Sequence, residues 1–589
     1  MMQNLKKSLS RNKYIFITLI LSMSVFLLNI YYYVDITPAE NINDIRVGIS
    51  NYQNFTSIGV GFNNSNSDIS LSFGNNEVLK NSLELRQNEK LVAKAVSRYS
   101  IISNSSFNSY QEAKSYADTL QNGYAYLKNG SWYVIDGVYS YEKDANAYWT
   151  SSDSVEGVKK ISQSDGKIEL VNNSIGVYIN DKLNFVVQEN LYMKASDGLF
   201  TLGKNTYRNI IQIRNSTSTT NLISAINLIN IEDYLYSVVP NEMPALWHEE
   251  ALKAQSIACR NFAYSNMNVH IKDGYNICNT NHCQVYEGIA NEHEKTTEAV
   301  KQTENIFIYH DDEIINAVYS SSNGGYSENS EDVWYDEVPY LKAIPDIHEA
   351  NAKEWSRTFS FQEISNLAKV GEIQEIQLDI LTESQRVLNL ILVGADGTKI
   401  VEKDTIRTFF EPTSEGSLDS KNFYIEGAVL SARESTDPNF IKDEIIEVFD
   451  VFTVANKEQL GKDEEDSLEL QKLNSEQEVF VLSKDGEQTQ KLNSKFAINY
   501  VGEIHKLEYR DILSENNLLD NSDIYNNNLA PNEVIKKVIT SGHNNSITLV
   551  GRGWGHGVGM SQYGANSLAN NGFGYEEILK YYYTDVEVR

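Results

Sequence analysis

Hydrophobic residues recur along this chain with different periods, and each period predicts a different element. The first run, Tyr14–Val34, holds no charged residue and is long enough to cross the ~30 Å apolar layer of a bilayer. The basic residues that precede it are Lys6, Lys7, Arg11 and Lys13. This order predicts an uncleaved single-pass anchor with a cytoplasmic tail at residues 1–13 and all later residues outside the cytoplasm. A cleaved signal peptide is the alternative, although no small-x-small cleavage site follows the run.

Short strands are predicted directly after the anchor, over Arg46–Ile49 and Ser57–Phe62. The stretch Tyr99–Trp149 then follows the order strand, helix, two strands and the start of a helix. This order is similar to that of the SPOR domain, a peptidoglycan-binding module. It predicts a SPOR-like segment over residues 99–164.

A helix is the clearest element of the middle of the chain. Two β-rich runs come before it, separated by the polar turn cluster Asn215–Asn221. The helix is predicted over Glu249–Met267, where Glu249 and Lys253 form an i,i+4 pair. Its predicted inner face carries Leu252, Gln255, Cys259 and Phe262. Cys259 on this face is most simply a small buried hydrophobe.

The stretch Gly551–Ala565, GRGWGHGVGMSQYGA, has glycine at every second position from 551 to 559. A period of two predicts a strand with bare backbone on one face and large side chains on the other. Phosphate-binding loops need a different spacing and flexible linkers a different composition. Two interpretations stay open: a ligand surface, or tight packing against another part of the chain.

Together these elements predict an α+β protein with mostly short-stranded mixed sheets and a few helices, multidomain and preceded by one transmembrane helix. The segment 428–542, which contains the acidic patch Gly461–Gln471, reads as an accessory insertion with a solvated charged face. The predicted boundaries are 1–13 (tail), 14–34 (anchor), 35–98 (N-terminal β-rich part), 99–164 (SPOR-like segment), 165–427 (core), 428–542 (insertion) and 543–589 (C-terminal part of the core).

Composition narrows the function classes. The formal net charge is −30 and the pI about 4.8, which excludes a broad nucleic-acid surface and argues against electrostatic binding to anionic lipid. The 3 cysteines form no disulfide framework, so the stability of this chain of 589 residues comes from ordinary cores.

Four stretches in order and spacing resemble the stage II sporulation protein D family, also called the SpoIID/LytB-type domain. They are Glu232–Pro244 with Glu250–Tyr264, Cys283–Gly288, Ala317–Leu341 and Gly551–Ala565. The resemblance implies a cell-envelope lytic transglycosylase that acts on peptidoglycan glycan strands already stripped of stem peptides by a partner amidase. This chain departs from the pattern in its length and at Ser320, where many members carry His.

The resemblance implies that Glu242 is the catalytic acid and base. Its apolar neighbours in VVPNEMPALW also favour a protonated carboxyl group, which is what a general acid needs. The alternatives are that Glu242 only caps or pairs at a helix, or that Glu232, Glu249 or Glu250 takes the role. Predicted substrate-binding residues are Arg260, Lys253, Ser321, Gly324, Gly325, Trp554, His556, Ser561 and Gln562. For His556 the alternative is a packed histidine that holds a turn, while Ser561 is also expected to cap a helix that starts after Met560.

A metal site is the second chemical hypothesis. Zinc prefers four nitrogen or sulfur ligands, and Cys278, His282, Cys283 and His270 lie within one short segment. Clostridial members of the family are similar in carrying a Cys/His zinc site here, so one structural zinc is expected, with none required for the chemistry. Because His282 and Cys283 are adjacent, His248 or water is an alternative fourth ligand. A Cys278–Cys283 disulfide or two unpaired thiols remain open.

Two other functions compete with the transglycosylase. LytB-type relatives with the same blocks are described as modifiers, so a non-catalytic wall-binding enhancer of an amidase is the main alternative. A zinc hydrolase of the H-E-x-x-H type is excluded, because the fourth residue after His248 is Leu252.

Overall fold

The computed structural model describes the greater part of the chain outside its N-terminus and the acidic insertion. The described residues are 44–50, 53–62, 69–73, 80–85, 90–151, 159–188, 190–346, 349, 352–381, 384–426, 429–434, 467–469, 471–472, 481–483, 496–497, 534–540 and 546–589. The predicted anchor Tyr14–Val34 lies outside them. None of the helices that these residues form has the length and apolar character needed to cross a membrane.

The chain forms two compact units. Unit 1 contains the described residues up to Ala317, together with Ala569–Lys580 and Asp585–Arg589, and unit 2 contains those of Val318–Leu568 and Tyr581–Thr584. The core predicted over 165–427 is therefore divided after Ala317, a boundary that no composition change in the sequence indicated.

Unit 1 is built on a 13-stranded sheet with the order β13-β1-β12-β11-β10-β2-β5-β7-β6-β9-β8, to which β3 and β4 are added beside β10. Its strands are β1 (Asp44–Gly48), β2 (Ser57–Phe62), β3 (Ile69–Phe73), β4 (Lys80–Leu85), β5 (Leu91–Ser103), β6 (Gly123–Lys128), β7 (Ser131–Tyr139), β8 (Gly166–Ile179), β9 (Lys182–Val187), β10 (Leu191–Leu202), β11 (Asn205–Asn215), β12 (Ile223–Asn230) and β13 (Ile277–Cys278). A small sheet joins β14 (Ile308–His310), β15 (Glu313–Ile314) and β30 (Glu587–Val588).

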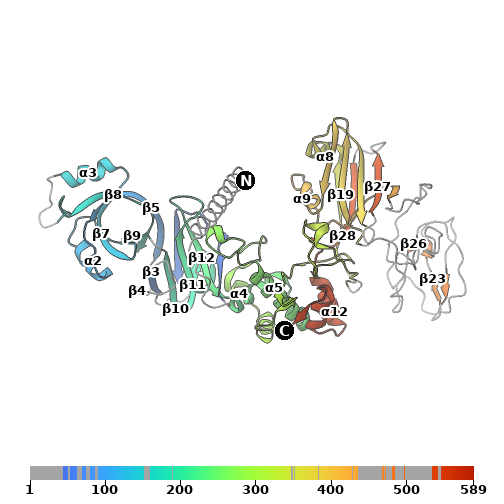
Figure 1. Ribbon diagram of the computed structural model, residues 1–589, viewed down its shortest axis with the longest axis horizontal. Coiled ribbons are helices and arrows are strands. Elements are labelled where there is room, and N and C mark those ends of the chain that lie inside the picture. The colour runs from blue at the N-terminus through green and yellow to red at the C-terminus, as the bar shows by residue number, and fades with distance from the viewer. Residues whose placement is uncertain are drawn as a thin grey trace, which may run out of the picture. The chain divides into compact units, whose positions relative to one another are not determined.

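The predicted SPOR-like segment forms the far part of this sheet. Helices α2 (Tyr110–Ala117) and α3 (Glu142–Thr150) lie between its strands, so the predicted order strand, helix, two strands, helix is confirmed. Strand β5 pairs with both β7 and β8, while β9 pairs with β6 and β8. These pairings close five strands into the ring visible in Figure 1. Buried residues such as Val96, Tyr126 and Val186 form one core cluster in this part.

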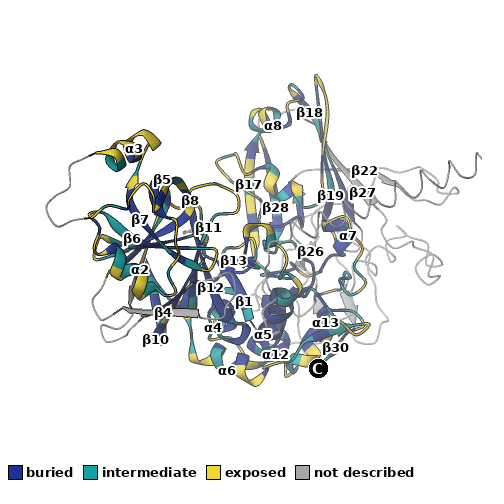
Figure 2. Cartoon of the chain, turned by 60° about the vertical axis from the view of Figure 1, so that its left-hand side comes forward, coloured by how far each residue is buried: buried dark blue, intermediate teal, exposed yellow. Residues whose placement is uncertain are grey.

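Three further helices of unit 1 come after β12. They are α4 (Ile231–Glu242), α5 (Glu249–Ser265) and α6 (Glu294–Gln302), with 3-10 turns at Ile271–Asp273 and Gly288–Asn291. The predicted helix over Glu249–Met267 is confirmed as α5, and its Glu249–Lys253 pair is present at 2.9 Å. Most of α5 is buried, and it is dark blue in Figure 2.

Unit 2 contains a five-stranded sheet with the order β20-β19-β18-β27-β22 and a three-stranded sheet with the order β17-β28-β21. Residues of both sheets, among them Phe359, Leu378 and Leu549, share one hydrophobic core. The strands are β16 (Tyr319–Ser320), β17 (Glu354–Ser360), β18 (Ile373–Leu381), β19 (Val387–Gly394), β20 (Gly397–Glu402), β21 (Phe423–Ile425), β22 (Val429–Glu434), β23 (Ser467–Glu469), β24 (Gln471–Lys472), β25 (Val481–Ser483), β26 (Phe496–Ala497), β27 (Val534–Thr540), β28 (Ser546–Arg552) and β29 (Met560–Ser561). The helices are α7 (Ser330–Val333), α8 (Phe361–Ala368) and α9 (Thr405–Phe409). The last helices of the chain are α12 (Gln562–Asn570) and α13 (Tyr575–Tyr582).

The insertion 428–542 begins and ends in the sheet of unit 2, because β22 and β27 pair with each other at its two ends. Most of its acidic patch lies outside the described residues. The α+β class and the mixed sheets are confirmed by parallel pairs such as β6–β9 within largely antiparallel sheets. Most strands are short, as expected, but the large sheet also contains long ones, since β8 has 14 residues and β5 has 13.

Candidate functional site

Glu242 is the last residue of α4. The helix begins after Asn230, whose side chain accepts a hydrogen bond from the Glu232 N–H at 2.9 Å and so caps the first turn. Pro240 lies in the final turn, and the backbone turns to an extended conformation at Met243, which is fully buried. The sequence analysis placed no helix here. Glu242 therefore projects from the C-terminal end of a helix.

The environment of Glu242 favours the protonated carboxyl group. Its side chain is partly exposed, and the Val285 N–H donates a hydrogen bond to its Oε1 at 3.3 Å. Desolvation raises the pKa of Glu242 from 4.5 to about 7, against a small lowering by the Val285 hydrogen bond. The carboxyl group is thus placed to hold and release a proton near neutral pH.

A short segment, residues 283–288, which we call the strap, positions Val285, the hydrogen-bond donor to Glu242. The Tyr234 hydroxyl of α4 donates to Gln284 Oε1 at 3.1 Å, and Gln284 Nε2 donates to the Cys259 carbonyl at 3.3 Å. The Asn241 amide donates to the Val285 carbonyl at 3.4 Å. The strap is therefore fixed to both α4 and α5. The sequence predicted a role for Cys283 but none for Gln284 and Val285, although their place in the block Cys283–Gly288 was a signal.

Arg260 is fully buried and paired with Glu232 through two hydrogen bonds of 2.7 Å each. Its remaining nitrogen donates to the Ile306 carbonyl at 3.2 Å. This geometry gives Arg260 a structural role, because a sugar would reach the guanidinium only after a buried ion pair had broken. It also removes Glu232 as a rival to Glu242, since the Glu232 carboxylate is occupied by the arginine.

The other predicted residues of α5 form an ion-pair cluster at its first turn. Lys253 contacts Glu249 at 2.9 Å and Glu250 at 2.8 Å, and Glu250 also accepts the Tyr575 N–H at 2.9 Å. Desolvation raises the pKa of Glu250, but the hydrogen bonds from Lys253 and the Tyr575 N–H outweigh it, so the pKa is lowered overall. Glu250 therefore stays ionised and is a poor general acid. The His248 ring accepts the Glu250 N–H at 3.3 Å and caps α5.

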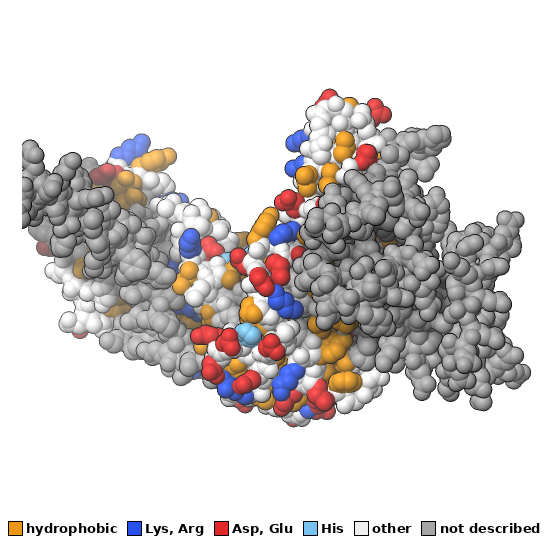
Figure 3. All heavy atoms as spheres, turned by 45° about the vertical axis from the view of Figure 1, so that its right-hand side comes forward, with side chains coloured by type: hydrophobic (Ala, Val, Ile, Leu, Met, Phe, Trp, Pro, Cys, Tyr) orange, Lys and Arg blue, Asp and Glu red, His pale blue; other side chains and the backbone are white. Residues whose placement is uncertain are grey.

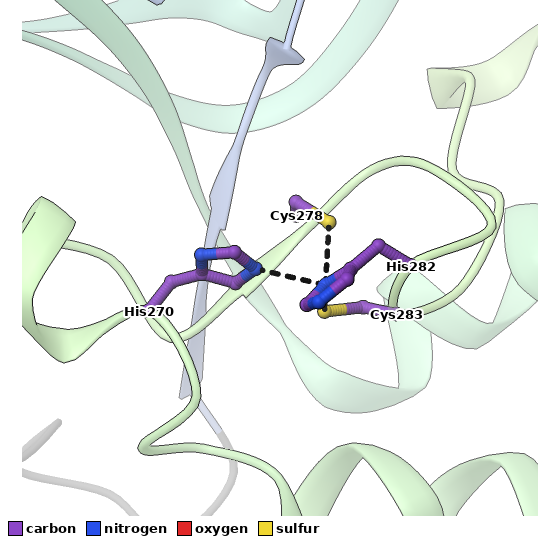
Figure 4. A group of neighbouring side chains, drawn as sticks. All are labelled: His270, Cys278, His282 and Cys283. Atoms are coloured by element: carbon purple, nitrogen blue, oxygen red, sulfur yellow. Dashed lines mark hydrogen bonds between the residues drawn. The ribbon is translucent and has the colours of Figure 1, made fainter. Parts of the chain in front are cut away.

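The four predicted metal ligands are brought together. His270, Cys278, His282 and Cys283 offer ligand atoms that all lie within 4.8 Å of one another, and Figure 4 shows their side chains pointing toward one point. His282 Nδ1 lies 3.3 Å from His270 Nε2, 3.8 Å from Cys278 Sγ and 3.5 Å from Cys283 Sγ. Both cysteines are free thiols. Adjacent His282 and Cys283 thus do converge, while His248 serves as a helix cap.

Features beyond the four ligands also fit zinc. The Asp273 carboxylate lies 3.0 Å from His270 Nδ1, which leaves Nε2 directed at the cluster, as in many carboxylate–histidine–zinc sites. A hydrogen bond with Cys283 lowers the pKa of the Cys278 thiol to about 3, and the same bond raises the pKa of Cys283. A thiolate, the form of cysteine that binds metal, is therefore available. Two sulfurs and two imidazoles make a closed structural zinc set.

In unit 2, the glycine-rich stretch is not the predicted strand. Strand β28 ends at Arg552, and the chain between it and β29 has left-handed backbone at every second residue, with φ of 83°, 111°, 81° and 72° at Gly553, Gly555, Gly557 and Gly559. A side chain on these glycines would also meet the segment 318–324 or the Arg386 guanidinium. Backbone conformation and close packing therefore require the glycines, which favours the internal-packing interpretation.

His556 follows the packed-histidine interpretation as well. Its Nδ1 accepts the Val558 N–H at 3.0 Å, and burial lowers its pKa to about 4, so the ring is neutral. Ser561 is fully buried, and its Oγ accepts the Gly564 N–H at 3.0 Å, which confirms the predicted cap of α12. Gln562 is buried beside it.

The remaining predicted residues lie around the turn after β16. The Gly324 N–H donates to the buried Glu349 carboxylate at 2.9 Å, Gly325 is exposed, and Ser321 is half-buried. The buried Ser320 hydroxyl donates to Asn323 Oδ1 at 3.1 Å. Trp554 is the one member of the predicted set in unit 2 with a large exposed side chain, at 44%.

Comparison with known proteins finds a family match over this part of the chain. The family described as "Stage II sporulation protein" (SpoIID) matches residues 219–310, which include Glu242, Arg260 and the Cys/His cluster. The "Amidase enhancer" of Bacillus subtilis is 29% identical over 59% of this chain, and "Stage II sporulation protein D" of the same organism is 24% identical over 61%. An uncharacterized protein of Brachyspira hyodysenteriae is 28% identical over 46%. The match spans 39%, 74% and 72% of these relatives, respectively. Residues 219–310 therefore form a stage II sporulation protein (SpoIID) domain by sequence similarity.

Proposed function

We propose that this protein is a cell-wall enzyme that cleaves the glycan strands of peptidoglycan by lytic transglycosylation. The observation that carries the proposal is Glu242, a partly exposed carboxyl group whose pKa is raised to about 7 by desolvation. A general acid works best when its pKa is near the working pH. The names of the Bacillus subtilis relatives support a role in the cell wall and in sporulation.

The reaction needs one carboxyl group. Protonated Glu242 donates its proton to the glycosidic oxygen that leaves, and the C1–O4 bond breaks. The Glu242 carboxylate then takes the proton of the muramyl C6 hydroxyl, whose oxygen forms a bond to C1. The products are a free 4-hydroxyl end and a 1,6-anhydromuramyl end, and no water is consumed. Hydrolytic glycosidases generally need a second carboxylate to activate water or attack carbon.

Zinc belongs to the proposal in a structural role. His270, Cys278, His282 and Cys283 would hold one ion, which ties the segment around the cluster together and supplies no step of the reaction. Cys283 lies two residues before Val285, the hydrogen-bond donor to Glu242. The cluster residues thereby keep the strap in contact with the catalytic carboxyl group.

We place the working enzyme at the cell membrane, anchored by Tyr14–Val34 with its C-terminal domains outside the cytoplasm. Its substrate is glycan freed of stem peptides, and a cell-wall amidase is the expected partner. Protease added to intact protoplasts is expected to remove the chain beyond Val34, and full protection of the C-terminal part would refute this topology.

The test is Glu242→Gln, which keeps the shape of the side chain and removes its acidity. On purified amidase-treated glycan, mass spectrometry is expected to show 1,6-anhydro ends formed about 10²- to 10⁴-fold more slowly than by the parent chain. Glycan binding is expected to survive, and Glu298→Gln on the exposed face of α6 serves as the control. Anhydro ends released at the parental rate by Glu242→Gln would show that another group is the acid.

A non-catalytic amidase enhancer is the second candidate, because one relative carries that name. It predicts that the parent chain releases no anhydro ends, yet increases the rate at which a cell-wall amidase removes stem peptides. The same glycan assay, run with and without amidase, separates the two functions.

A further inference from the structure

Three large aromatic side chains of unit 2 are exposed, one in the glycine-rich loop and two in the segment whose Trp334 contacts that loop. Trp334 is 38% exposed, Tyr335 76% and Trp554 44%. The Trp334 ring centroid lies 5.2 Å from that of His556, two residues beyond Trp554. Exposed aromatic groups of this size often mark an interaction site.

Two lysines fix these rings in place. Lys403 Nζ donates to the carbonyls of Glu331 at 2.6 Å and Trp334 at 2.7 Å, and it lies 4.4 Å from the centre of the Tyr335 ring. Lys353 Nζ lies 3.4 Å from the centre of the Trp554 ring. A surface whose side chains are already ordered loses less entropy when a ligand binds.

The neighbouring backbone supports the same arrangement. The Lys353 carbonyl accepts the Gly553 N–H at 2.8 Å, and Trp554 exchanges backbone hydrogen bonds of 3.1 and 2.9 Å with Ser322. Backbone hydrogen bonds to two other segments thus fix the chain at Gly553 and Trp554, while nearly half of the Trp554 side chain stays exposed.

The three aromatic side chains lie among charges of both signs, because Asp332 and Asp336 flank Trp334 and Tyr335 in the sequence while Lys353 and Lys403 contact two of the rings. The protein carries a net charge of −30, and on the face drawn in Figure 3 acidic side chains gather around a histidine. A carboxylate ligand is repelled by such a protein unless cations receive it locally. Lys353, whose side chain is 50% exposed, supplies such a cation beside Trp554, and its Nζ lies 3.9 Å from the Asp419 carboxylate, farther than a hydrogen bond.

We propose that Trp334, Tyr335 and Trp554, together with Lys353 and Lys403, form an aromatic platform that binds muramyl glycan with free lactyl carboxylates. The aromatic faces receive the apolar faces of the sugar rings, and the Lys353 ammonium group receives a lactyl carboxylate. The inference rests on the proposed function, because it names the subsite chemistry of that substrate. It explains selectivity for glycan from which an amidase has removed the peptides, since the amide-linked lactyl group carries no charge.

The test measures binding by calorimetry with the full chain carrying Glu242→Gln, so that glycan is not consumed. Trp554→Ala and Trp334→Ala are each expected to weaken binding of amidase-treated glycan about tenfold or more. Tyr141→Ala is the matched control, because Tyr141 is 62% exposed but lies in unit 1. Unchanged thermal unfolding of the variants excludes misfolding as the cause.

The charge is tested with a second ligand. Lys353→Met is expected to weaken binding of muramyl glycan severalfold, while chitooligosaccharides of equal length, which lack the lactyl carboxylate, bind unchanged. Parental affinity of Trp554→Ala and Trp334→Ala for muramyl glycan would overturn the platform, even if the parent chain cleaves glycan. Conversely, a parent chain that cleaves nothing but loses binding in these variants would refute the transglycosylase and support the platform.

Discussion

Replacement of Glu242 by Gln is expected to stabilise the protein in a pH-dependent way. Desolvation raises the pKa of Glu242 from 4.5 to about 7, and one pKa unit corresponds to about 1.4 kcal/mol. The full shift therefore amounts to about 3 kcal/mol, which solvent screening of the partly exposed side chain reduces to about 1–3 kcal/mol. This free energy is the penalty that the folded state bears when the carboxyl group ionises.

The sign follows from the raised pKa. Below pH 4.5 the carboxyl group is protonated in both states and the penalty is absent; between 4.5 and 7 the unfolded state loses its proton first, so stability falls as pH rises. Above about pH 7 the penalty is complete. Glu242→Gln is thus expected to raise the free energy of unfolding by about 1–3 kcal/mol at about pH 8 and to leave it nearly unchanged at about pH 4.

Differential scanning calorimetry at these two pH values is the assay, because the two units are expected to unfold in separate transitions. For a unit of this size, about 2–4 °C in Tm corresponds to each kcal/mol. Glu298→Gln, at an exposed position of α6, controls for the loss of one negative charge. A difference between Glu242→Gln and the parent that does not vary with pH would refute the desolvated carboxyl group, and with it the case for Glu242 as general acid.

Three further predictions concern the ionisation of Glu242, the Cys/His cluster and the glycine-rich loop. Activity on amidase-treated glycan is expected to fall as pH rises through about 7, because Glu242 must begin protonated; a rate that keeps rising beyond about pH 8 contradicts this. Purified protein is expected to carry one equivalent of zinc by elemental analysis. Chelation is expected to loosen the strap and shift the falling limb of the pH–activity profile to higher pH, because the Val285 hydrogen bond lowers the pKa of Glu242. An unchanged profile after complete chelation would contradict this link between the metal site and Glu242. Gly557→Ala is expected to destabilise unit 2 by about 3 kcal/mol or more in thermal unfolding, because it strains a left-handed residue and displaces the buried Arg386. Gly325→Ala, at a left-handed glycine with open space around it, is expected to cost only about 1–3 kcal/mol. Equal effects of the two substitutions would contradict the packing argument.

Local sequence patterns predicted the elements whose physics is local. Helix α5 shows helical spacing and an i,i+4 pair, and the polar cluster Asn215–Asn221 separates β11 from β12 as expected. Helix α4 was missed, since its apolar run and Pro240 resemble a strand that ends at a turn. The closure of β5 and β8 into a ring depends on pairing between distant residues, which no single-sequence period reveals.

The candidate site could be predicted where the residue types within one short segment indicate its chemistry. Cysteine and histidine within one short segment indicated a metal site, and the structure brings all four predicted ligands together. The glycine-rich stretch was misjudged because a period of two describes both an ideal strand and a chain with left-handed glycines at alternate positions. The positive φ angles of these glycines and the packing of segment 318–324 and Arg386 against them distinguish the two.

The raised pKa of Glu242 depends on the pairing of nearby cations with other carboxylates. Helix α5 carries two cations, and each is committed to another carboxylate: Arg260 to Glu232, and Lys253 to Glu249 and Glu250. Glu242 also stands at the C-terminal end of α4, where the partial negative charge of the helix disfavours an anion. Either cation, if free to reach Glu242, would lower its pKa and ionise the acid before it met substrate. These ion pairs thus keep positive charge away from the Glu242 carboxyl group, as its proposed role as general acid requires.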